Sequence, residues 1–402
     1  MNVDLMRKVD YYAGIPLCFL ATFIVQLSNL FKTTTQAKRV LLLELSEMGS
    51  AILVDPAMQK LKNVAGAELY FVIFEKNKPS LKLLNSVEDQ NIFTIRETGI
   101  LPLAIDTLKF FVWCRSNKID SVIDLELFSR YTALLTGLSG ANNRVGFHAF
   151  HNEGLYRGAM LTHKVSYNAH QHIAKSFVAL VNALISEKTE LPYSKTIVSD
   201  DEIKLRQAIV NIEQQDAIRA KIREDYPGFE HTKHQLVLIN PNASELLPQR
   251  RWMMDRYAEL MRRILDHSKT AVVVITGAPA ERAEAEALRG AVSNTRCINF
   301  AGRVKFTELP PLYSISQLLV TNDSGPGHFS SVTPLKTFVL FGPETPALYG
   351  SLGNSTPIYA GLACSPCVSA SNHRKTACSD NVCLKTITVD TVFNTISPFL
   401  LT

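Results

Sequence analysis

Short apolar runs recur along the chain, and each gives way to small or polar residues. Seven of these runs have the length and composition of buried parallel strands: 39–45, 69–74, 122–125, 235–239, 271–275, 318–320 and 337–341. Stretches with helical signals lie between them, as at 103–114 and 255–265. Strands that alternate with helices predict an α/β protein with doubly wound parallel sheets.

The run from Tyr11 to Phe31 differs from the others because it is long and carries no charge, with Arg7 and Lys8 before it and Lys32 after it. As one helix it would extend roughly 30 Å, close to the thickness of a bilayer core. Four interpretations fit: a spanning anchor, a helix in the membrane interface, a signal peptide, or a hydrophobic helix packed on the protein itself. Polar residues within the run and the lack of a clear cleavage site lead us to predict membrane association for residues 1–35.

The polar stretch from Thr321 to His328 follows one apolar run and precedes another, in the order strand, turn, helix, strand. Open α/β sheets bind ligands at such turns, and the start of a helix suits a pyrophosphate. The glycines let a ligand approach the backbone, and Asp323 or Ser324 can cap the helix. A well-capped turn without a ligand is the alternative. The residues that we predict to bind a ligand are Asp323, Ser324, Gly325, Pro326 and His328.

The motif Asp-Ser-Gly-Pro-x-His at 323–328, followed by Phe-Gly-Pro-Glu-Thr-Pro at 341–346, resembles glycosyltransferase family nine, the ADP-heptose:lipopolysaccharide heptosyltransferases. The resemblance runs from about Lys38 to Cys383. It implies the GT-B fold, in which two Rossmann-like doubly wound domains face a cleft, here with an added N-terminal hydrophobic helix. We expect a membrane-associating segment at 1–35, an acceptor domain at 36–190, a linker and helix at 191–232, and a nucleotide-sugar-binding domain at 233–402.

The resemblance also implies donor-binding residues in the C-terminal half. Arg250 stands where the family has a Lys on the donor phosphates, and its planar fork suits phosphate. A solvated basic pair is the alternative, although cations are unfavourable at a helix start. Glu281 is expected to hold the ribose hydroxyls, or else only to interact with a helix dipole. The other expected donor contacts are Asn242, Thr276 and Gly277.

The first turn of the N-terminal half departs from the family pattern. The family's catalytic base is an Asp directly after a Gly, whereas Gly49 is followed here by Ser50. A serine hydroxyl does not act unaided as a base at neutral pH. The nearest carboxylate is Glu47, and we predict that it takes the proton of the acceptor hydroxyl. The alternative is that Glu47 only caps or solvates the next helix and that turnover has been lost.

Composition limits the other possibilities. A chain of 402 residues with 46% hydrophobic and 20% charged residues is typical of two globular domains. The net charge of +5 comes without a basic stripe interleaved with aromatics, so nucleic acid is not an expected partner. The odd number of cysteines, seven, is typical of reduced thiols. Four of them, Cys364, Cys367, Cys378 and Cys383, have spacings that fit a structural zinc site, reduced thiols or a disulfide.

The resemblance, together with these observations, implies an inverting glycosyltransferase that needs no metal or cofactor for catalysis. It would move a heptose or related sugar from a nucleotide-sugar, ADP-heptose first, to a lipopolysaccharide-core or similar lipid-linked glycan. We expect it on the cytoplasmic face of the inner membrane. A nucleotide-sugar epimerase of the same fold and a non-catalytic nucleotide-sugar-binding protein are the rival hypotheses.

Overall fold

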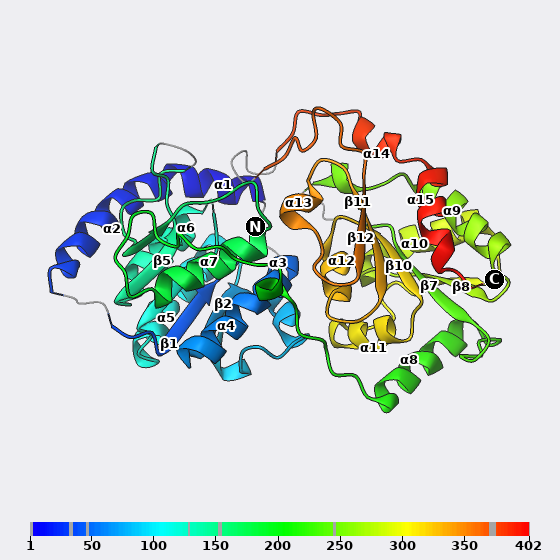
Figure 1. The fold of residues 1–402 in the computed structure, drawn as a ribbon, viewed down its shortest axis with the longest axis horizontal. Helices are drawn as coiled ribbons and strands as arrows, with labels where there is room; N and C mark the ends of the chain where they lie inside the picture. The colour runs from blue at the N-terminus through cyan, green and yellow to red at the C-terminus, as the bar shows by residue number, and fades with distance from the viewer. Residues whose placement is uncertain are drawn as a thin grey trace. The chain divides into compact units, whose positions relative to one another are not determined.

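The computed structural model describes residues 3–31, 35–45, 48–127, 129–151, 155–243, 247–369 and 375–401. The chain divides into two compact units, Met1–Lys204 and Leu205–Thr402. Figure 1 shows the first in blue to green and the second in green to red. The division falls within 191–232, the segment expected to be a linker and helix.

Unit 1 is built around a six-stranded parallel sheet with the order β3-β2-β1-β4-β5-β6. The strands are β1 (Arg39–Leu43), β2 (Glu68–Phe74), β3 (Ile92–Ile95), β4 (Ser121–Asp124), β5 (Asn143–Phe147) and β6 (His163–Val165). In β1 the residues that face either side of the sheet, Val40 and Leu42 on one and Leu41 and Leu43 on the other, are all fully buried. Burial on both faces explains why the strand is a continuous apolar run rather than an alternating one.

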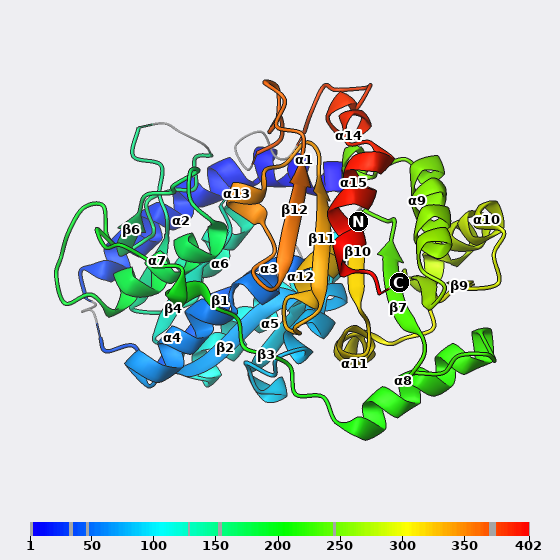
Figure 2. The same ribbon diagram turned by 45° about the vertical axis from the view of Figure 1, so that its right-hand side comes forward.

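Helices cover both faces of this sheet. On one face, α5 (Ile100–Ser116) and α6 (Arg130–Leu138) share a core with Leu41, Leu43 and Val122. On the other, α4 (Asp55–Ala65) and α7 (Ile173–Ile185) pack on each other and on the sheet, and the short α3 (Met48–Leu53) precedes α4. Figure 2 gives a second view of the helices on the two faces of this sheet.

The uncharged N-terminal run forms part of two helices rather than one, which corrects the expectation of a single helix. They are α1 (Val3–Tyr12) and α2 (Gly14–Asn29). Pro16 explains the break, because its ring would clash with the carbonyl of Tyr12 in a continuous helix and it has no N–H to donate. Among the described residues no single helix is long and apolar enough to cross a bilayer, although Leu5–Tyr12 and Gly14–Asn29 together pass that test as a pair bent by 44°.

The helix pair is also packed on unit 1. Small residues on one face of α2, among them Cys18 and Ala21, are buried against Ala133 of α6 and Met160. A Cβ at Gly158, whose φ is +74°, would lie 2.9 Å from the Cys18 carbonyl oxygen, so the close approach requires glycine there. The opposite face of the pair is apolar and exposed through Tyr11, Tyr12, Leu17, Phe19, Leu20, Phe23, Ile24 and Leu27, and the exposed Leu30 and Phe31 follow the end of α2.

Polar contacts fix the helix pair further. The Asp10 carboxylate accepts hydrogen bonds from the backbone N–H groups of Arg130 and Tyr131, each at 2.9 Å, and pairs with the Arg130 guanidinium at 3.2 Å. At the other end of α2, Asn29 Oδ1 accepts a 2.7 Å hydrogen bond from the buried guanidinium of Arg144. The pair is therefore an integral part of unit 1.

Unit 2 repeats the topology of unit 1, with a six-stranded parallel sheet in the order β12-β11-β10-β7-β8-β9. Its strands are β7 (Gln235–Asn240), β8 (Ala271–Ile275), β9 (Cys297–Asn299), β10 (Leu318–Asn322), β11 (Lys336–Phe341) and β12 (Ser355–Tyr359). Its helices are α8 (Ile212–Asp225), α9 (Met254–His267), α10 (Arg282–Val292), α11 (Leu309–Ser314), α12 (Gly325–Ser330), α13 (Pro346–Tyr349), α14 (Val382–Thr386) and α15 (Val389–Ile396). Numbered from its first strand, each sheet has the order 3-2-1-4-5-6 of a dinucleotide-binding fold, which confirms the predicted fold class.

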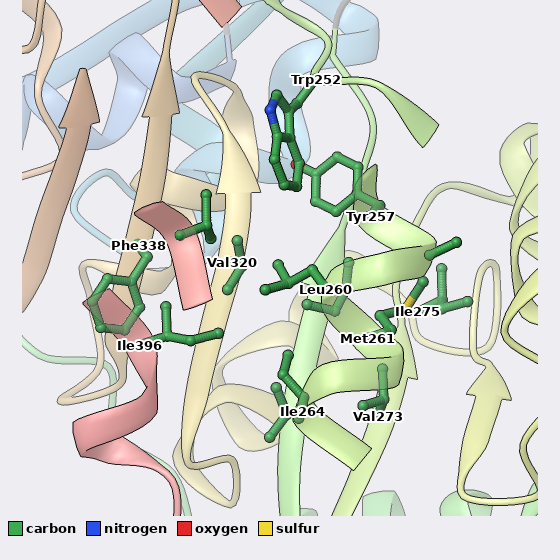
Figure 3. Packing of buried hydrophobic residues seen from close by; sticks show 14 of the residues in the cluster. Trp252, Tyr257, Leu260, Met261, Ile264, Val273, Ile275, Val320, Phe338 and Ile396 are labelled. Carbon is green, nitrogen blue, oxygen red and sulfur yellow. The ribbon is translucent and has the colours of Figure 1, made fainter. Parts of the chain in front are cut away.

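The core of unit 2 continues up to the carboxyl ends of its strands. Figure 3 shows Trp252 and Tyr257 beside each other there, above Leu260 and Ile264 of α9. Trp252 and Tyr257 are fully buried, and their rings meet edge to face. Because such rings bury large areas, they hold the loop that contains Arg250 rigidly on the sheet.

Candidate functional site

The strand order of unit 2 reverses between β7 and β10, which pair in parallel. The strands β8 and β9 follow on one side and β11 and β12 on the other, so the carboxyl ends of β7 and β10 border a topological switch point. Open α/β sheets bind ligands at such points. The donor-binding residues predicted from the sequence follow β7, β8 and β10, and they therefore lie along this edge.

Asn322, the last residue of β10, connects the segments around the switch point. Its Oδ1 accepts hydrogen bonds from the Trp252 backbone N–H and the Tyr257 hydroxyl, both at 3.0 Å. Its Nδ2 donates to the carbonyl oxygens of Pro241 at 2.8 Å and Asn242 at 3.2 Å. Since the side chain is completely buried, these bonds offset the cost of burying an amide and fix the loop after β7.

Arg250 ends a 3₁₀ turn, Pro248–Arg250, and is only 8% exposed, so it is not a solvated basic residue. Its Nε lies 3.2 Å from Asp323 Oδ2, and its Nη2 donates to Glu344 Oε1 at 3.1 Å. Both carboxylates are buried. A cation between two carboxylates is held in one position, but a bound phosphate would have to compete with both of them.

A second cluster forms after β7 and β8 around Gly277. A Cβ at Gly277 would lie 2.8 Å from Glu281 Oε2 and 3.0 Å from Asn242 Nδ2, so only glycine lets these groups approach the turn. The Glu281 carboxylate accepts the Ala278 N–H at 2.6 Å. Burial raises the pKa of Glu281, and the Ala278 hydrogen bond and the Arg251 charge oppose that shift. The buried Asn242 Oδ1 accepts no hydrogen bond from the described part of the chain, so it is an acceptor that a ligand hydroxyl or amine could satisfy.

Thr276 lies beside this cluster and connects two strand ends. Its hydroxyl donates to the Ile239 carbonyl oxygen at 3.3 Å, and it lies 3.2 Å from Asn240 Nδ2, which can donate to it. The residue is buried and joins the end of β8 to the end of β7.

At the turn 323–328, the cap at Ser324 and the role of the two glycines differ from what the sequence predicts. Ser324 occupies the cap position of α12, but its hydroxyl donates to the Asn322 carbonyl oxygen at 3.1 Å and makes no cap hydrogen bond to the helix. The two glycines are explained by packing as well as by ligand approach. A Cβ at Gly325 would lie 2.8 Å from the Phe329 ring, and one at Gly327 would lie 2.9 Å from Ser351 Oγ. Pro326 lies in the first turn, and His328 is buried.

The predicted base, Glu47, lies outside the described residues. Ser50 lies in α3 and is half-buried. The strand end that leads to this turn is fixed, because the Leu45 N–H donates to Glu126 Oε1 and its carbonyl accepts from Asn77 Nδ2, both at 2.9 Å. The role of Glu47 stays a prediction.

The four C-terminal cysteines are all described and all free thiols. Cys364 is exposed and Cys383 is buried, and burial raises the pKa of the Cys383 thiol, with smaller contributions from Cys367 and Cys378. Across the described residues, no three His, Cys, Asp or Glu side chains are grouped so that they could hold a metal ion. The zinc site stays a prediction that metal analysis can test.

Sequence reasoning missed two residues of the site, Asn322 and Glu344. Each follows or ends an apolar strand, which is the signal that could have found them. Their partners are 70 and 94 residues away along the chain, so the contacts themselves depend on the tertiary fold.

The sequence model described as glycosyltransferase family 9 (heptosyltransferase) matches residues 108–377, which is more than half of the chain. The chain belongs to glycosyltransferase family 9. The match includes both motifs, 323–328 and 341–346, on which the resemblance rests, and it confirms that resemblance.

Individual relatives are distant. Lipooligosaccharide heptosyltransferase 2 of Campylobacter jejuni is 27% identical over 155 residues, which are 37% of this chain and 47% of that protein. The chain thus spans about half the length of this curated relative.

Solved structures resemble the fold over most of the chain. The E. coli ADP-heptose lipopolysaccharide heptosyltransferase II superposes with a TM-score of 0.67 at 18% identity, covering 90% of this chain and 98% of the other. A family 9 glycosyltransferase from Veillonella parvula superposes with a TM-score of 0.68 at 18% identity, covering 92% and 99%. At these identities the likeness shows a shared fold.

Proposed function

We propose that this chain is an inverting glycosyltransferase that moves a heptose or related sugar from a nucleotide-sugar, ADP-heptose first, to a lipopolysaccharide-core or similar glycan. The observation that carries the proposal is the pair of polar clusters at the switch point of unit 2. One is Asn242, Gly277 and Glu281, and the other is Arg250 with two buried carboxylates. Membership of family 9 supports the same activity.

Each cluster receives one part of the donor. We assign Glu281 and Asn242 to the nucleoside, because a half-buried carboxylate and an unsatisfied amide oxygen accept hydrogen bonds from ribose or base groups. We assign Arg250 and the turn at 323–328 to the diphosphate and the sugar. Asp323 and Glu344 orient Arg250. Asp323→Ala and His328→Ala should therefore weaken donor binding.

The reaction needs one displacement at the anomeric carbon. The acceptor hydroxyl oxygen forms the new bond to that carbon, the bond to the diphosphate oxygen breaks, and a base takes the hydroxyl proton. Cationic and N–H groups stabilise the leaving diphosphate. We assign Glu47 as the base, and the scheme uses no metal. Glu47→Gln should abolish transfer and leave donor affinity unchanged; transfer at the wild-type rate would exclude Glu47 as the base.

We also propose that the chain works at the cytoplasmic face of the inner membrane, held there by its N-terminal helices. A lipid-linked acceptor is anchored in that surface. The exposed apolar side chains of α1 and α2 support this part of the proposal.

Ser50 favours a second candidate, a non-catalytic nucleotide-sugar-binding protein, because it replaces the family's base. A thermal-shift screen of nucleoside diphosphates and their sugars, followed by product analysis with and without acceptor, separates the two. Our proposal predicts stabilisation by ADP and ADP-heptose and a glycosylated product only when acceptor is present. Stabilisation without any product would support the binding protein. A changed sugar in the absence of acceptor would indicate an epimerase instead.

A further inference from the structure

Helix α5 of unit 1 has an apolar face that nothing in the described part of the chain covers. Leu101, Ile105, Leu108 and Val112 follow the spacing of one helical stripe, and three of them, Leu101, Leu108 and Val112, are 70%, 68% and 65% exposed. The opposite face is buried through Asp106, Phe110 and Cys114. A helix that only covers a sheet would carry polar residues on its outer face.

The stripe on α5 is one part of an apolar surface that three helices, α2, α5 and α6, form together. Along the sheet, α5 contacts β3, α6 contacts β4, and α2 is fixed at β5 through Asn29 and Arg144. The middle helix, α6, contacts both of the others. Its partly exposed side chains are also apolar: Tyr131, Leu134 and Leu138. We call the outer faces of α2, α5 and α6 the apolar helix layer.

The exposed charged side chains that the structure describes on α1, α2, α5 and α6, and just after α5, are all cations, namely Lys8, Lys109, Arg115 and Lys118. The acidic side chains that the structure describes on α1, α2 and α5 are both neutralised, since Asp10 pairs with Arg130 and Asp106 pairs with Arg96. An apolar surface with exposed basic residues complements an anionic lipid surface.

We propose that the apolar helix layer rests on an anionic phospholipid bilayer, with α5 as a second membrane contact beside α2. The inference deepens the membrane association proposed above and rests on it. It assigns a mode in which the helices lie in the interface and do not cross the bilayer.

The contacts of α2 favour this mode over a spanning anchor. To cross the bilayer, the α1–α2 pair would have to leave unit 1. That would break the ion pair between Asp10 and Arg130 and the hydrogen bond between Asn29 and Arg144. It would also expose the buried apolar cluster that α2 forms with Ala133 and Met160, and the loss of this buried area adds to the loss of the polar contacts. A second copy of the chain fits less well, because a self-complementary contact would bring like charges together.

The test is co-sedimentation of the full chain with two kinds of vesicle, phosphatidylcholine alone and phosphatidylcholine mixed with phosphatidylglycerol. The variant is Leu101→Ser/Leu108→Ser/Val112→Ser, whose positions are exposed, so the fold should be retained. The matched control is Ile197→Ser/Ile209→Ser, at positions that are 94% and 98% exposed outside the layer. Donor binding by calorimetry is measured on every sample.

We expect wild-type chain to bind the anionic vesicles more tightly than the neutral ones, with binding weakened by salt. The α5 variant should bind at least about tenfold more weakly, because several large apolar side chains no longer enter the interface. The control should bind like wild type, and donor affinity should be the same in all three chains.

Unchanged vesicle binding by the α5 variant would overturn the assignment of α5, even if α2 still held the chain on the vesicles. Absence of vesicle binding by wild type, together with a dimer that the α5 substitutions dissociate, would assign the layer to self-association and overturn the lipid proposal. Because donor binding is measured separately, loss of the membrane proposal leaves the proposed transfer reaction to be judged on its own result.

Discussion

Asn322 and Glu344 show how a few buried side chains determine the candidate donor site. Asn322 fixes the loop after β7 through both ends of its amide. Glu344 fixes Arg250 from the loop after β11, while Asp323 contacts it from the turn after β10. Motif positions in the sequence predicted Asp323 and Arg250, but they did not predict that these two residues would pair with each other.

Replacement of Glu344 tests that ion-pair arrangement. Glu344→Gln keeps the shape but removes one carboxylate partner of a buried guanidinium, so we expect the free energy of unfolding to fall by about 1–3 kcal/mol. Chemical denaturation measures the effect. The control is Glu284→Gln, which alters the exposed pair with Arg251 and should change stability by less than about 0.5 kcal/mol. Equal effects of the two substitutions would contradict the arrangement.

The raised pKa of Glu281 makes a prediction with a definite sign. The folded state binds this proton more tightly than the unfolded state does, because burial penalises the carboxylate. The stability from this group is therefore present below its ordinary pKa and is lost as pH rises through the raised value. Glu281→Gln should raise the midpoint of thermal unfolding at neutral pH but not at about pH 4. A variant that is less stable than wild type at neutral pH would reverse the sign and refute the argument.

At the scale of elements, apolar runs predicted the central strands well because those strands are buried on both faces. β1, β7, β8, β10 and β11 all lie within one or two residues of the predicted runs. The edge strand β12 gave no such signal, since most of it is partly exposed and it contains Pro357. The helix expected within 191–232 begins at Ile212, where Asn211 and Gln214 form a capping box. Charged composition alone did not locate that start.

The α1–α2 pair could not be placed from the sequence, because its small residues Gly14, Cys18 and Ala21 indicate a packed face only once α6 is known. The structure gives it two faces, one against the protein and one exposed. Membrane association and packing on the protein are therefore compatible, because each uses a different face of the pair. The sequence analysis treated them as alternative interpretations of the same run.

The contact between α1 and α6 can be tested at Asp10. Asp10→Ala removes two hydrogen bonds at the start of α6 and the partner of the buried Arg130, so the free energy of unfolding should fall by about 1.5–3 kcal/mol. Denaturation is the measurement, and Asp216→Ala, in an exposed pair with Arg219, is the control with almost no expected change. If Asp10→Ala is as harmless as the control, the helix pair is not an integral part of unit 1.

For the whole molecule, the duplicated 3-2-1-4-5-6 sheet and the family 9 match agree with the prediction made from the motifs. The sequence predicts which residues lie at the strand ends, because parallel strands end at a common edge. It does not predict how far each side chain lies from its partners, since that distance depends on loops between strands such as the one that holds Arg250.

The cysteine segment carries a separate prediction. If Cys364, Cys367, Cys378 and Cys383 hold one zinc, elemental analysis of protein purified without added metal should give about one zinc per chain. A chelator should then lower the unfolding temperature. Protein without zinc, in which a thiol reagent modifies all four cysteines after denaturation, would refute the site and identify reduced thiols.

Calorimetric titration of ADP tests whether a nucleotide-sugar binds at the switch point of unit 2. We expect ADP to bind wild type in the range of about 1 μM to 1 mM that is typical of enzyme substrates. Asn242→Ala should weaken ADP binding at least about tenfold, because it removes the buried amide at the nucleoside cluster, while Glu284→Gln should bind normally. If ADP does not bind wild type, or binds Asn242→Ala with unchanged affinity, the nucleoside does not bind at the Asn242 cluster.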